Sequence, residues 1–342
     1  MATIYDLVTA KNLAAYWDEK RKERKPFLLE AFFPADKQLG LELSWIKGAN
    51  KSPVALQLSA FDAKAIPISR QGFDKLQTDM PFFKNSMNID EKQRQELNKV
   101  IGSGNQEMIN LILRRVFDDK TNLLENADVA REILRAQIIT TGTINISSNG
   151  QAYAYDYSVP NANKVTNDWT TVATADPIGD IVAWQDIVET ATGERPTNLV
   201  MNLTTFNLIG KTNAVKNAVY VFANGSVDVG RPEVKSYILR QTGCNVWIYD
   251  KGYVNDSGVW TKFIPNNVVS LLPDMVGKTW FGTTPEESDL MNDPTVQVEL
   301  VDMGVAITNS KESDPVNVMT KASMICLPSG ELADRMIIAS IT

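Results

Sequence analysis

The sequence predicts an α+β protein in which an extended β-hairpin precedes a long helical region and a mixed second half. Three observations support this prediction. Residues 39–83 alternate apolar and polar side chains, residues 88–140 repeat apolar residues at helical spacing, and the later part alternates short strands with helices. The chain has 342 residues, 44% of them hydrophobic, which is enough core material for two domains or one elaborate one.

The N-terminal segment is predicted to form an arm. A short amphipathic helix is expected over about residues 4–17, and the charged run 18–25 and Pro26 follow it. Such a run suits either a solvated helix end or a contact with a neighbouring subunit or another partner. The apolar group 27–33 comes next and ends at Pro34, so the arm leads directly into extended chain.

Alternating apolar and polar residues after the arm predict a long hairpin. One strand face carries Leu39, Leu41, Leu43 and Trp45. The alternation continues through residues 54–74 and is broken at Pro67 and Gly72. A hairpin without a core of its own must pack elsewhere, because an isolated strand pair is marginal in water. Its partner is expected either on the same chain or on a neighbouring subunit.

Residues 88–140 are predicted to be mostly helical, because apolar residues recur there at intervals of three and four. The first apolar stripe comprises Leu97, Val100, Ile101, Ile109, Ile112, Leu113 and Val116. Gly102 and Gly104 are expected to kink or loosen this helix. Asn126 or Asp128 is expected to cap a second helix, because short polar side chains accept hydrogen bonds from free backbone N–H groups.

Turn and cap residues organise the rest of the chain. Asn149-Gly150 predicts a hairpin turn, because both central positions of a type I′ turn need positive φ. Asp176 is expected to cap a helix with Pro177 at its first position. Later helices are expected at 203–220 and 231–243, with a hairpin around 256–258. Strands are expected at 197–202, 244–250, 268–273, 298–310, 316–328 and 336–342.

Histidine is absent from the sequence, and this absence excludes much familiar catalytic chemistry. Ser-His-Asp and Cys-His nucleophile systems need an imidazole base. Zinc sites that contain histidine are excluded too, and Cys244 and Cys326 cannot make a four-thiolate site. The two cysteines are interpreted as unpaired buried thiols in a reducing compartment, with a disulfide or a reactive thiol as the alternative.

No motif for nucleotide binding or acid–base catalysis is complete. The Gly-Lys-Thr segments at 210–212 and 277–279 lack the upstream glycine of a phosphate-binding loop. The adjacent carboxylates at 118–119 and 286–287 point apart on a regular element and are interpreted as solvated surface. No catalytic, cofactor-binding or metal-binding residue is therefore predicted, and no cofactor. Core positions are favoured for Trp169, Trp184, Trp247, Trp260 and Trp280.

Charge and hydropathy bear on the compartment and the partners. The formal net charge is −7, from 34 basic and 41 acidic side chains, and does not indicate a nucleic-acid-binding protein. The N-terminus has charges where a signal peptide would need an apolar core. Because no run of about 18 apolar residues occurs, no transmembrane helix and no membrane partner are expected.

Four segments together resemble the lambda-type major capsid protein E family of tailed bacteriophages. They are FLLEAFFPADKQLGLELSWIKG, AQIITTGTINISSNGQAYAYDYSVPN, NDWTTVATADPIGDIVAWQDIVETATGERPTNLVMN and GYVNDSGVWTKFIPNNVVSLLP. Their order and spacing over nearly the whole chain support the resemblance, since no single motif is specific. The resemblance implies the Hong Kong 97-type capsid fold. It also implies a major capsid protein that self-assembles into the icosahedral shell around the phage genome.

Carried over by position, the resemblance implies five parts. They are an N-terminal arm at 1–50, an extended β-hairpin loop at 51–83, a peripheral domain with a long spine helix at 84–165, an axial domain at 166–300, and strands returning to the peripheral domain at 301–342. The hairpin, helix and mixed half expected from the residues follow the same order. The extended loop would lie over a neighbour, and axial domains would meet in hexamers and pentamers.

Apolar residues of the arm and the loop are the candidate intersubunit contacts. They are Phe32, Phe33, Trp45, Leu56, Leu58 and Phe61. Packing on the same chain is the alternative for these residues. Lys64 is a formal candidate for the covalent Lys–Asn crosslink that some relatives of the fold form. No motif supports this role, so no self-crosslinking is expected.

The resemblance also implies partners. Some family members carry a long N-terminal scaffolding domain, whereas only a short arm precedes the hairpin here, so a separate scaffolding protein is expected. A portal protein, a decoration protein and non-specific contact with packaged double-stranded DNA complete the expected partners. Assembly is expected in the host cytoplasm, and the virion capsid is the expected final location.

Three alternatives remain open at this point. An encapsulin-like protein nanocompartment shell would share the fold but enclose enzyme cargo. A histidine-free enzyme working with lysine or carboxylates would need a deep pocket that gathers several ionisable groups. Another virion part, such as a tail-tube or head-completion protein, is the third.

Overall fold

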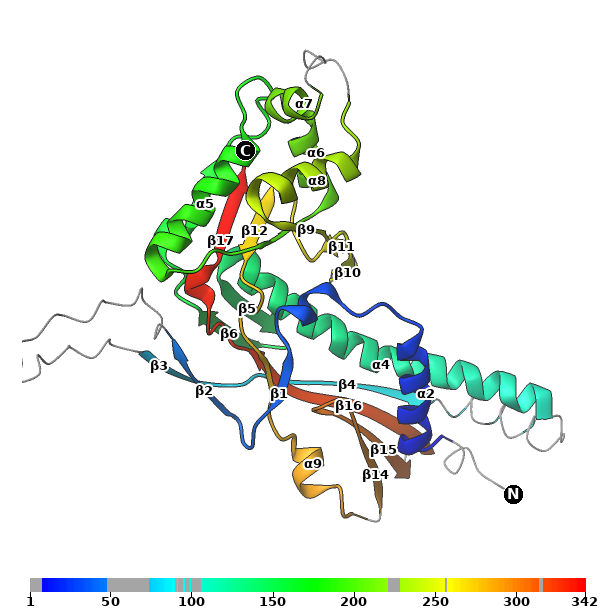
Figure 1. Cartoon of the computed structure of the whole chain (residues 1–342). Helices are drawn as coiled ribbons and strands as arrows, with labels where there is room; N and C mark the ends of the chain where they lie inside the picture. Colours follow the sequence, from blue (N-terminus) through cyan, green and yellow to red (C-terminus); the bar gives the residue numbers. More distant parts are fainter. Residues whose placement is uncertain are drawn as a thin grey trace, which may run out of the picture.

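A computed structural model describes residues 8–47, 74–89, 91, 95, 99, 106–220, 228–255, 257–293, 295–313 and 316–342. The predicted α+β class is confirmed. Two β-sheets, called here the lower and the upper sheet, are both contacted by one long helix, α4 (Figure 1). Within the described ranges, three two-stranded hairpins extend from this framework.

The lower sheet brings together the beginning, the middle and the end of the chain. Its strands are β1 (Ala35–Lys37), β4 (Phe82–Ile89), β13 (Thr279–Phe281), β14 (Val296–Val301), β15 (Val305–Ser313) and β16 (Val316–Pro328). The strand order is β1-β13-β16-β15-β14, and β4 also pairs with β16. β16 is the common partner of β4, β13 and β15, in antiparallel pairs. The short helix α9 (Pro285–Asp289) contacts β14 and β15.

The upper sheet has the order β7-β17-β12-β8-β9 and carries its own helices. Its strands are β7 (Lys164–Asn167), β8 (Asn198–Met201), β9 (Asn245–Ile248), β12 (Val268–Leu272) and β17 (Ile337–Ile341). The helices are α5 (Pro177–Thr192), α6 (Leu203–Lys211), α7 (Asn213–Val219) and α8 (Arg231–Thr242). A separate apolar cluster lies between this sheet and its helices, and Trp169 and Trp184 stack within it, with 5.7 Å between ring centroids. The core position predicted for these two tryptophans is confirmed.

The long helix α4 spans Gln106–Thr141 without interruption, so it is about 54 Å long at 1.5 Å per residue. The second helix expected to begin at Asn126 or Asp128 is therefore a wrong prediction. Apolar residues on both sides of that point, such as Leu124 and Leu134, belong to one buried cluster. Their burial outweighs the modest preference of Asn and Asp for a cap, because tertiary packing supplies most helix stability.

Local signals end the helix and set the next hairpin. Gly142 follows α4 with φ 76°, and a Cβ there would come within 2.7 Å of a Val159 methyl. β5 (Thr143–Ser148) and β6 (Gln151–Asp156) then pair around Asn149 (φ 51°) and Gly150 (φ 74°). Positive φ at both positions confirms the predicted turn. The predicted cap of α5 is confirmed as well, since the Asp176 carboxylate accepts from the Gly179 N–H at 3.1 Å.

The extended hairpin is paired at its base. β2 (Glu42–Lys47) runs antiparallel to β3 (Asp74–Asp79), with Lys47 opposite Asp74. The predicted kink residues Gly102 and Gly104 lie outside the described residues. The short 3-10 helices are η1 (Leu28–Ala31), η2 (Asn161–Asn163) and η3 (Ala333–Arg335).

Two segments differ from the sequence-based expectation. The arm helix α2 spans Ala10–Lys22, so most of the charged run continues the helix instead of following it. The last strands divide between the two sheets, because β14–β16 join the lower sheet whereas β17 pairs with β12 and β7 in the upper one. The return expected for 301–342 stays a prediction, with β14–β16 in one sheet and β17 in the other. Among the described helices, none has the length and apolar character needed to cross a membrane.

Candidate functional site

The charged arm helix binds the chain's own long helix. The hydroxyl of Tyr16 donates to the Asp118 carboxylate at 2.9 Å, and the Lys20 ammonium lies 3.1 Å from the same carboxylate. The hydrogen bond from Tyr16, assisted by Lys20, lowers the pKa of Asp118. Arg24 pairs with Glu125 at 2.6 Å. Part of the charged run thus pairs with α4, whereas other side chains of the run are exposed, so both alternatives left open by the sequence remain for them.

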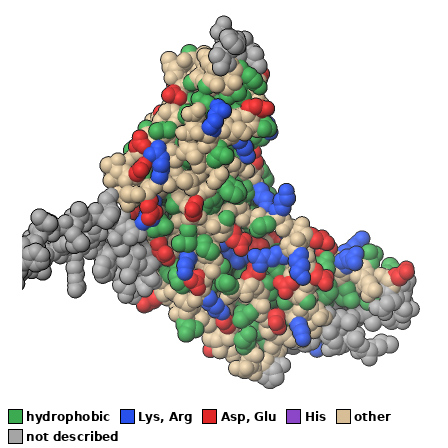
Figure 2. Space-filling model, in the orientation of Figure 1, with side chains coloured by type: hydrophobic (Ala, Val, Ile, Leu, Met, Phe, Trp, Pro, Cys, Tyr) green, Lys and Arg blue, Asp and Glu red, His purple; other side chains and the backbone are tan. Residues whose placement is uncertain are grey.

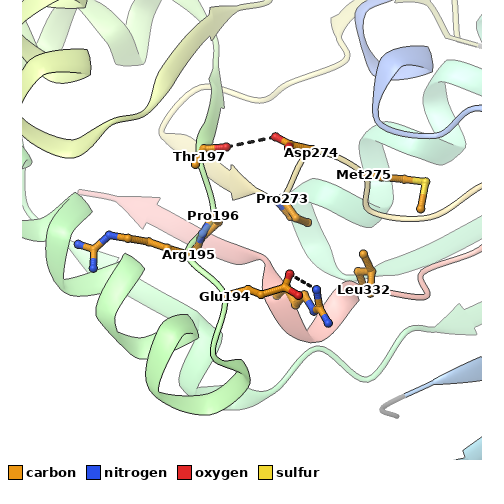
Figure 3. Close-up of a pocket in the computed structure, with 9 residues that line it drawn as sticks. Glu194, Arg195, Pro196, Thr197, Pro273, Asp274, Met275 and Leu332 are labelled. Atoms are coloured by element: carbon orange, nitrogen blue, oxygen red, sulfur yellow. Dashed lines mark hydrogen bonds and ion pairs between the residues drawn. The ribbon is translucent and has the colours of Figure 1, made fainter. Parts of the chain in front are cut away.

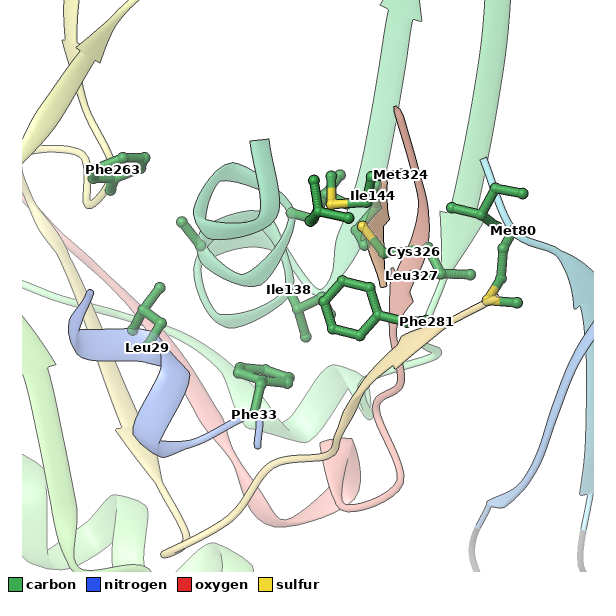
Figure 4. Close-up of a cluster of buried hydrophobic side chains, with 14 of the residues drawn as sticks. Leu29, Phe33, Met80, Ile138, Ile144, Phe263, Phe281, Met324, Cys326 and Leu327 are labelled. Atoms are coloured by element: carbon green, nitrogen blue, oxygen red, sulfur yellow. The ribbon is translucent and has the colours of Figure 1, made fainter. Parts of the chain in front are cut away.

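Phe32 and Phe33, two of the candidate intersubunit residues, are buried in their own chain. Their side chains are 3% and 0% exposed. The Phe32 ring meets Trp247 edge-on, with 6.1 Å between centroids. Figure 4 shows Phe33 and Leu29 pointing toward Ile138 on α4, inside the cluster that includes Phe281. Same-chain packing, the alternative left open by the sequence, accounts for both aromatic side chains.

The other candidate contacts remain predictions. Trp45 lies in β2, where its backbone is opposite Leu76 of β3. Leu56, Leu58, Phe61 and Lys64 lie outside the described residues. Trp45 thus lies in the paired base of the hairpin.

A buried carboxylate joins the arm, α4 and the chain that follows β9. Glu132 is 0% exposed, and its Oε1 accepts from the Leu29 N–H at 3.1 Å and from the Tyr249 hydroxyl at 2.7 Å. Its Oε2 lies 3.4 Å from Nη1 of Arg135, whose Nε donates to Thr279 of β13 at 3.0 Å. Burial raises the pKa of Glu132, while Arg135 and the hydrogen bonds act in the opposite direction. This cluster, the Glu132 junction, fixes the arm relative to both sheets.

A buried lysine lies farther along the same helix. Lys120 is 3% exposed, and its ammonium donates to the hydroxyl of Thr320 on β16. Thr320 donates to Asn309 on β15, whose amide donates to the Val8 carbonyl at 2.9 Å. In the part of the chain that the structure describes, no carboxylate lies within ion-pair distance of Lys120. Burial lowers the pKa of Lys120 to about 8.

The stability of the subunit should therefore increase with pH above about 8. The unfolded chain keeps the Lys120 proton up to its ordinary pKa of 10.5, whereas the folded chain releases it near 8. Between these values the unfolded state binds more protons, so the free energy of unfolding rises with pH, by on the order of 3 kcal/mol over the whole window. Lys120→Met should raise the free energy of unfolding at neutral pH. It should also remove the part of the increase with pH that comes from Lys120. Urea unfolding at about pH 7 and about pH 9.5 measures both effects.

Lys164→Met is the control, because Lys164 is exposed on β7. It should keep the pH dependence of the native chain. A Lys120→Met variant that retains the same rise in stability would contradict a buried, chargeable lysine.

The remaining groups singled out in the sequence have structural positions. Cys244 and Cys326 are buried and unpaired, as interpreted, and burial raises both thiol pKa values. Glu286 is only 4% exposed and pairs with Lys321 at 2.5 Å, so its interpretation as solvated surface is wrong. The sequence missed this because Lys321 is remote in the chain. Among the described residues, no group of three or more acidic or cysteine side chains could hold a metal ion.

Two tryptophans expected in the core are on the surface instead. Trp247 on β9 is 40% exposed, and Trp260 is 56% exposed. Trp260 begins β11 (Trp260–Lys262), which pairs with β10 (Gly252–Val254) in a hairpin. Val254 and Val259 beside it are 65% and 58% exposed. The sequence signal for this surface was the hairpin predicted around residues 256–258, because an isolated pair of strands has no core of its own.

Comparison with known proteins identifies the family of the chain. The family described as phage major capsid protein E matches residues 9–339. The chain belongs to this family. The capsid protein described here is therefore a structural component of the virion that acts in many copies. No curated protein matches the chain.

Solved structures show the same fold at low sequence identity. A phage-related protein from Bordetella bronchiseptica RB50 is 12% identical, with a TM-score of 0.57 and coverage of 97% of each chain. An E. coli CFT073 prophage protein assigned as a capsid protein is 14% identical, with a TM-score of 0.58 over 98% of this chain and 99% of that one. The capsid protein of Myoviridae phage XM1 is 11% identical, with a TM-score of 0.50 over 93% of this chain and 94% of that one. These similarities confirm the Hong Kong 97-type capsid fold.

Proposed function

We propose that this capsid protein self-assembles into the icosahedral shell that encloses the double-stranded DNA genome of a tailed bacteriophage. The family match over residues 9–339 is the observation that carries the proposal. Similarity to phage capsid structures over more than nine-tenths of the chain supports it. Assembly is proposed to occur in the host cytoplasm through hexamers and pentamers.

Each part of the chain is proposed to have the structural role that its position in the sequence implies. Residues 1–50 act as the arm, 51–83 as the extended loop, 84–165 as the peripheral domain and 166–300 as the axial domain, with 301–342 returning to the peripheral domain. The paired base of the β2–β3 hairpin supports a loop that leaves the subunit, and α4 supports the spine helix. β17 modifies this division, because it belongs to the sheet of the proposed axial domain.

The capsid protein is proposed to act without catalysis and without a cofactor. The lack of histidine supports this, as do acidic groups such as Glu132 and Glu286 that pair within the chain. Proposed partners are a separate scaffolding protein, a portal protein, a decoration protein and the packaged DNA. Figure 2 shows acidic and basic side chains interspersed over one face. A surface with mixed charges suits weak, sequence-independent contact with DNA, because phosphate attraction is partly cancelled.

Electron microscopy of the expressed protein, with and without its scaffolding protein, tests the proposal. Closed shells of uniform size are expected. A matched variant replaces residues 49–72 by a short Gly-Ser linker and leaves the β2–β3 pair intact. This variant should give folded subunits that form few or no shells, since the proposed loop contact with a neighbour is lost.

Persistent monomers of the native chain under every condition would contradict the capsid proposal. Shells that enclose host enzymes in place of DNA would favour the encapsulin-like alternative. Shells formed as well by the linker variant as by the native chain would contradict the role proposed for the loop.

A further inference from the structure

We propose that the β10–β11 hairpin of one copy docks into a pocket beneath the upper sheet of the next copy in the shell, with the Trp260 indole as the anchor. This inference rests on the proposed function and assigns one contact between copies. The hairpin and the pocket are different surfaces of the same chain. Each copy would therefore insert its hairpin into one neighbour and receive the hairpin of another neighbour in its pocket.

The hairpin presents apolar side chains at its tip. Val254 and Trp260 are directly opposite each other, so they share one face, and Val259 adjoins them. All three are more than half exposed. A Cβ at Gly252 would lie within 2.8 Å of the Trp260 ring, so glycine lets the indole lie flat against the hairpin. A large apolar ring held this way on a turn is unusual unless another surface covers it.

The hairpin is held rigidly by the rest of the subunit. At its tip, the Asn255 side-chain oxygen accepts from the N–H groups of Ser257 and Val259, at 3.1 and 2.9 Å. At its base, Phe263 packs against Tyr253 and Tyr249, with centroid separations of 5.3 and 5.8 Å. Tyr249 in turn donates to the Glu132 junction. A rigid projecting element loses little conformational entropy when it docks, and this favours binding.

The pocket has walls suited to an indole ring. It has a volume of about 280 Å³ and lies where the chain enters β8, leaves β12 and passes through η3. Figure 3 shows Pro196, Pro273, Met275 and Leu332 around it, with Arg195 at one side. The Arg335 side chain also lines it and pairs with Glu194. The Arg195 guanidinium points away from this space toward carboxylates of α5, so the apolar side chains are the surface offered to the indole.

A buried donor beside the pocket has no partner within the described part of the chain. Arg335 is 7% exposed, and its buried Nε has no hydrogen-bond partner among the described residues. A buried N–H without a partner is unfavourable, so such groups are rare in native structures. Because this Nε is covered by its own chain, a carbonyl of an inserted hairpin would accept from it only after the Arg335 side chain turns toward the pocket.

The positions of the two surfaces favour a second copy as the occupant. The hairpin lies beyond the β9 edge of the upper sheet, at the right in Figure 1, whereas η3 and the start of β17 lie at the left. Surfaces on opposite sides of one chain make head-to-tail contacts, and these close into rings when the rotation between copies allows it. A shell built from rings of one chain needs contacts of this kind.

Disulfide trapping tests the contact directly. Val259→Cys, which keeps the Trp260 anchor, and Met275→Cys are made in separate chains, which are mixed in equal amounts, assembled together and oxidised. Covalent dimers joining the two variant chains are expected in shells and not in unassembled subunits. The native cysteines are buried and unpaired, which limits background. In the control, Met291→Cys replaces Val259→Cys. Met291 is 49% exposed and lies outside the hairpin, so this pair should give no such dimer.

Trp260→Ala provides the second measurement. Shell yield should fall about tenfold or more, since a buried tryptophan anchor is a typical hot spot of an interface. The thermal midpoint of the unassembled subunit should not change, because Trp260 is 56% exposed there. Intact shells without the crosslink between positions 259 and 275, or an undiminished yield with Trp260→Ala, would overturn the docking while the proposed function stands. Failure of the native chain to form shells would overturn both.

Discussion

Glu132→Ala is expected to destabilise the subunit by about 3–5 kcal/mol, the cost typical of breaking a buried ion pair by removing one partner. Glu132 is fully buried, and its loss would leave the Arg135 charge, the Tyr249 hydroxyl and the Leu29 N–H without their shared acceptor. Each of these groups comes from a different part of the subunit. The arm would therefore lose its fixed position relative to the sheets, and shell yield should fall together with stability.

Chemical denaturation of the unassembled subunit measures this effect. Glu132→Gln keeps the shape and one acceptor oxygen but removes the charge opposite Arg135, so its loss of stability should be smaller than that of Glu132→Ala. Glu107→Ala is the matched control, because Glu107 is exposed in the first turn of the same helix. A Glu132→Ala subunit as stable as the Glu107→Ala subunit would show that the junction contributes nothing to the fold.

Phe33→Ala should cost about 3–5 kcal/mol of subunit stability, the usual range for removing a fully buried phenylalanine. Phe33 is 0% exposed, and it packs with Leu29 against α4 in the larger of the two apolar clusters formed by the described residues. The cavity left behind would be lined by side chains that already pack tightly, so little relaxation is expected. Unfolding of the isolated subunit by denaturant gives the measurement.

Leu39→Ala is the matched control for Phe33→Ala. Leu39 belongs to the same early segment but is 91% exposed, so its replacement should leave the stability of the unassembled subunit nearly unchanged. The pair separates same-chain packing from contact between copies. If Phe33→Ala instead retained full subunit stability and lost only shell assembly, Phe33 would be an intersubunit residue and its same-chain role would be refuted.

Local features of the chain were predictable because they depend on neighbouring residues. Asp176 caps α5 through a backbone N–H three residues away. Asn149 and Gly150 adopt the positive φ values that their turn requires. Paired strands at the hairpin base and a long helix after it also follow from periodicity, because alternating and helical spacing are read over a few residues at a time. The capsid fold itself was implied by the resemblance of four ordered segments to the phage capsid family, and the order of these elements agreed with it.

Burial depended instead on residues remote in sequence. Glu286 appeared to be surface until Lys321 was placed beside it, and Phe33 appeared as available for a neighbour as for its own core. Trp260 shows the opposite case, because a residue type that usually belongs to the core lies on a projecting hairpin. Composition cannot distinguish these outcomes, since each depends on which elements happen to cover the side chain.

The lack of histidine, the helix caps, the turns and the succession of hairpin, helix and mixed half are properties of the sequence alone. They exclude much catalytic chemistry and indicate a shell protein through resemblance. Tertiary structure alone decided that α4 continues through Asn126, that β17 joins the upper sheet, and that Glu132 links three parts of the chain. Long-range packing and buried charge pairing outweigh local preferences at these places, because the free energy of burial exceeds that of a single cap or turn.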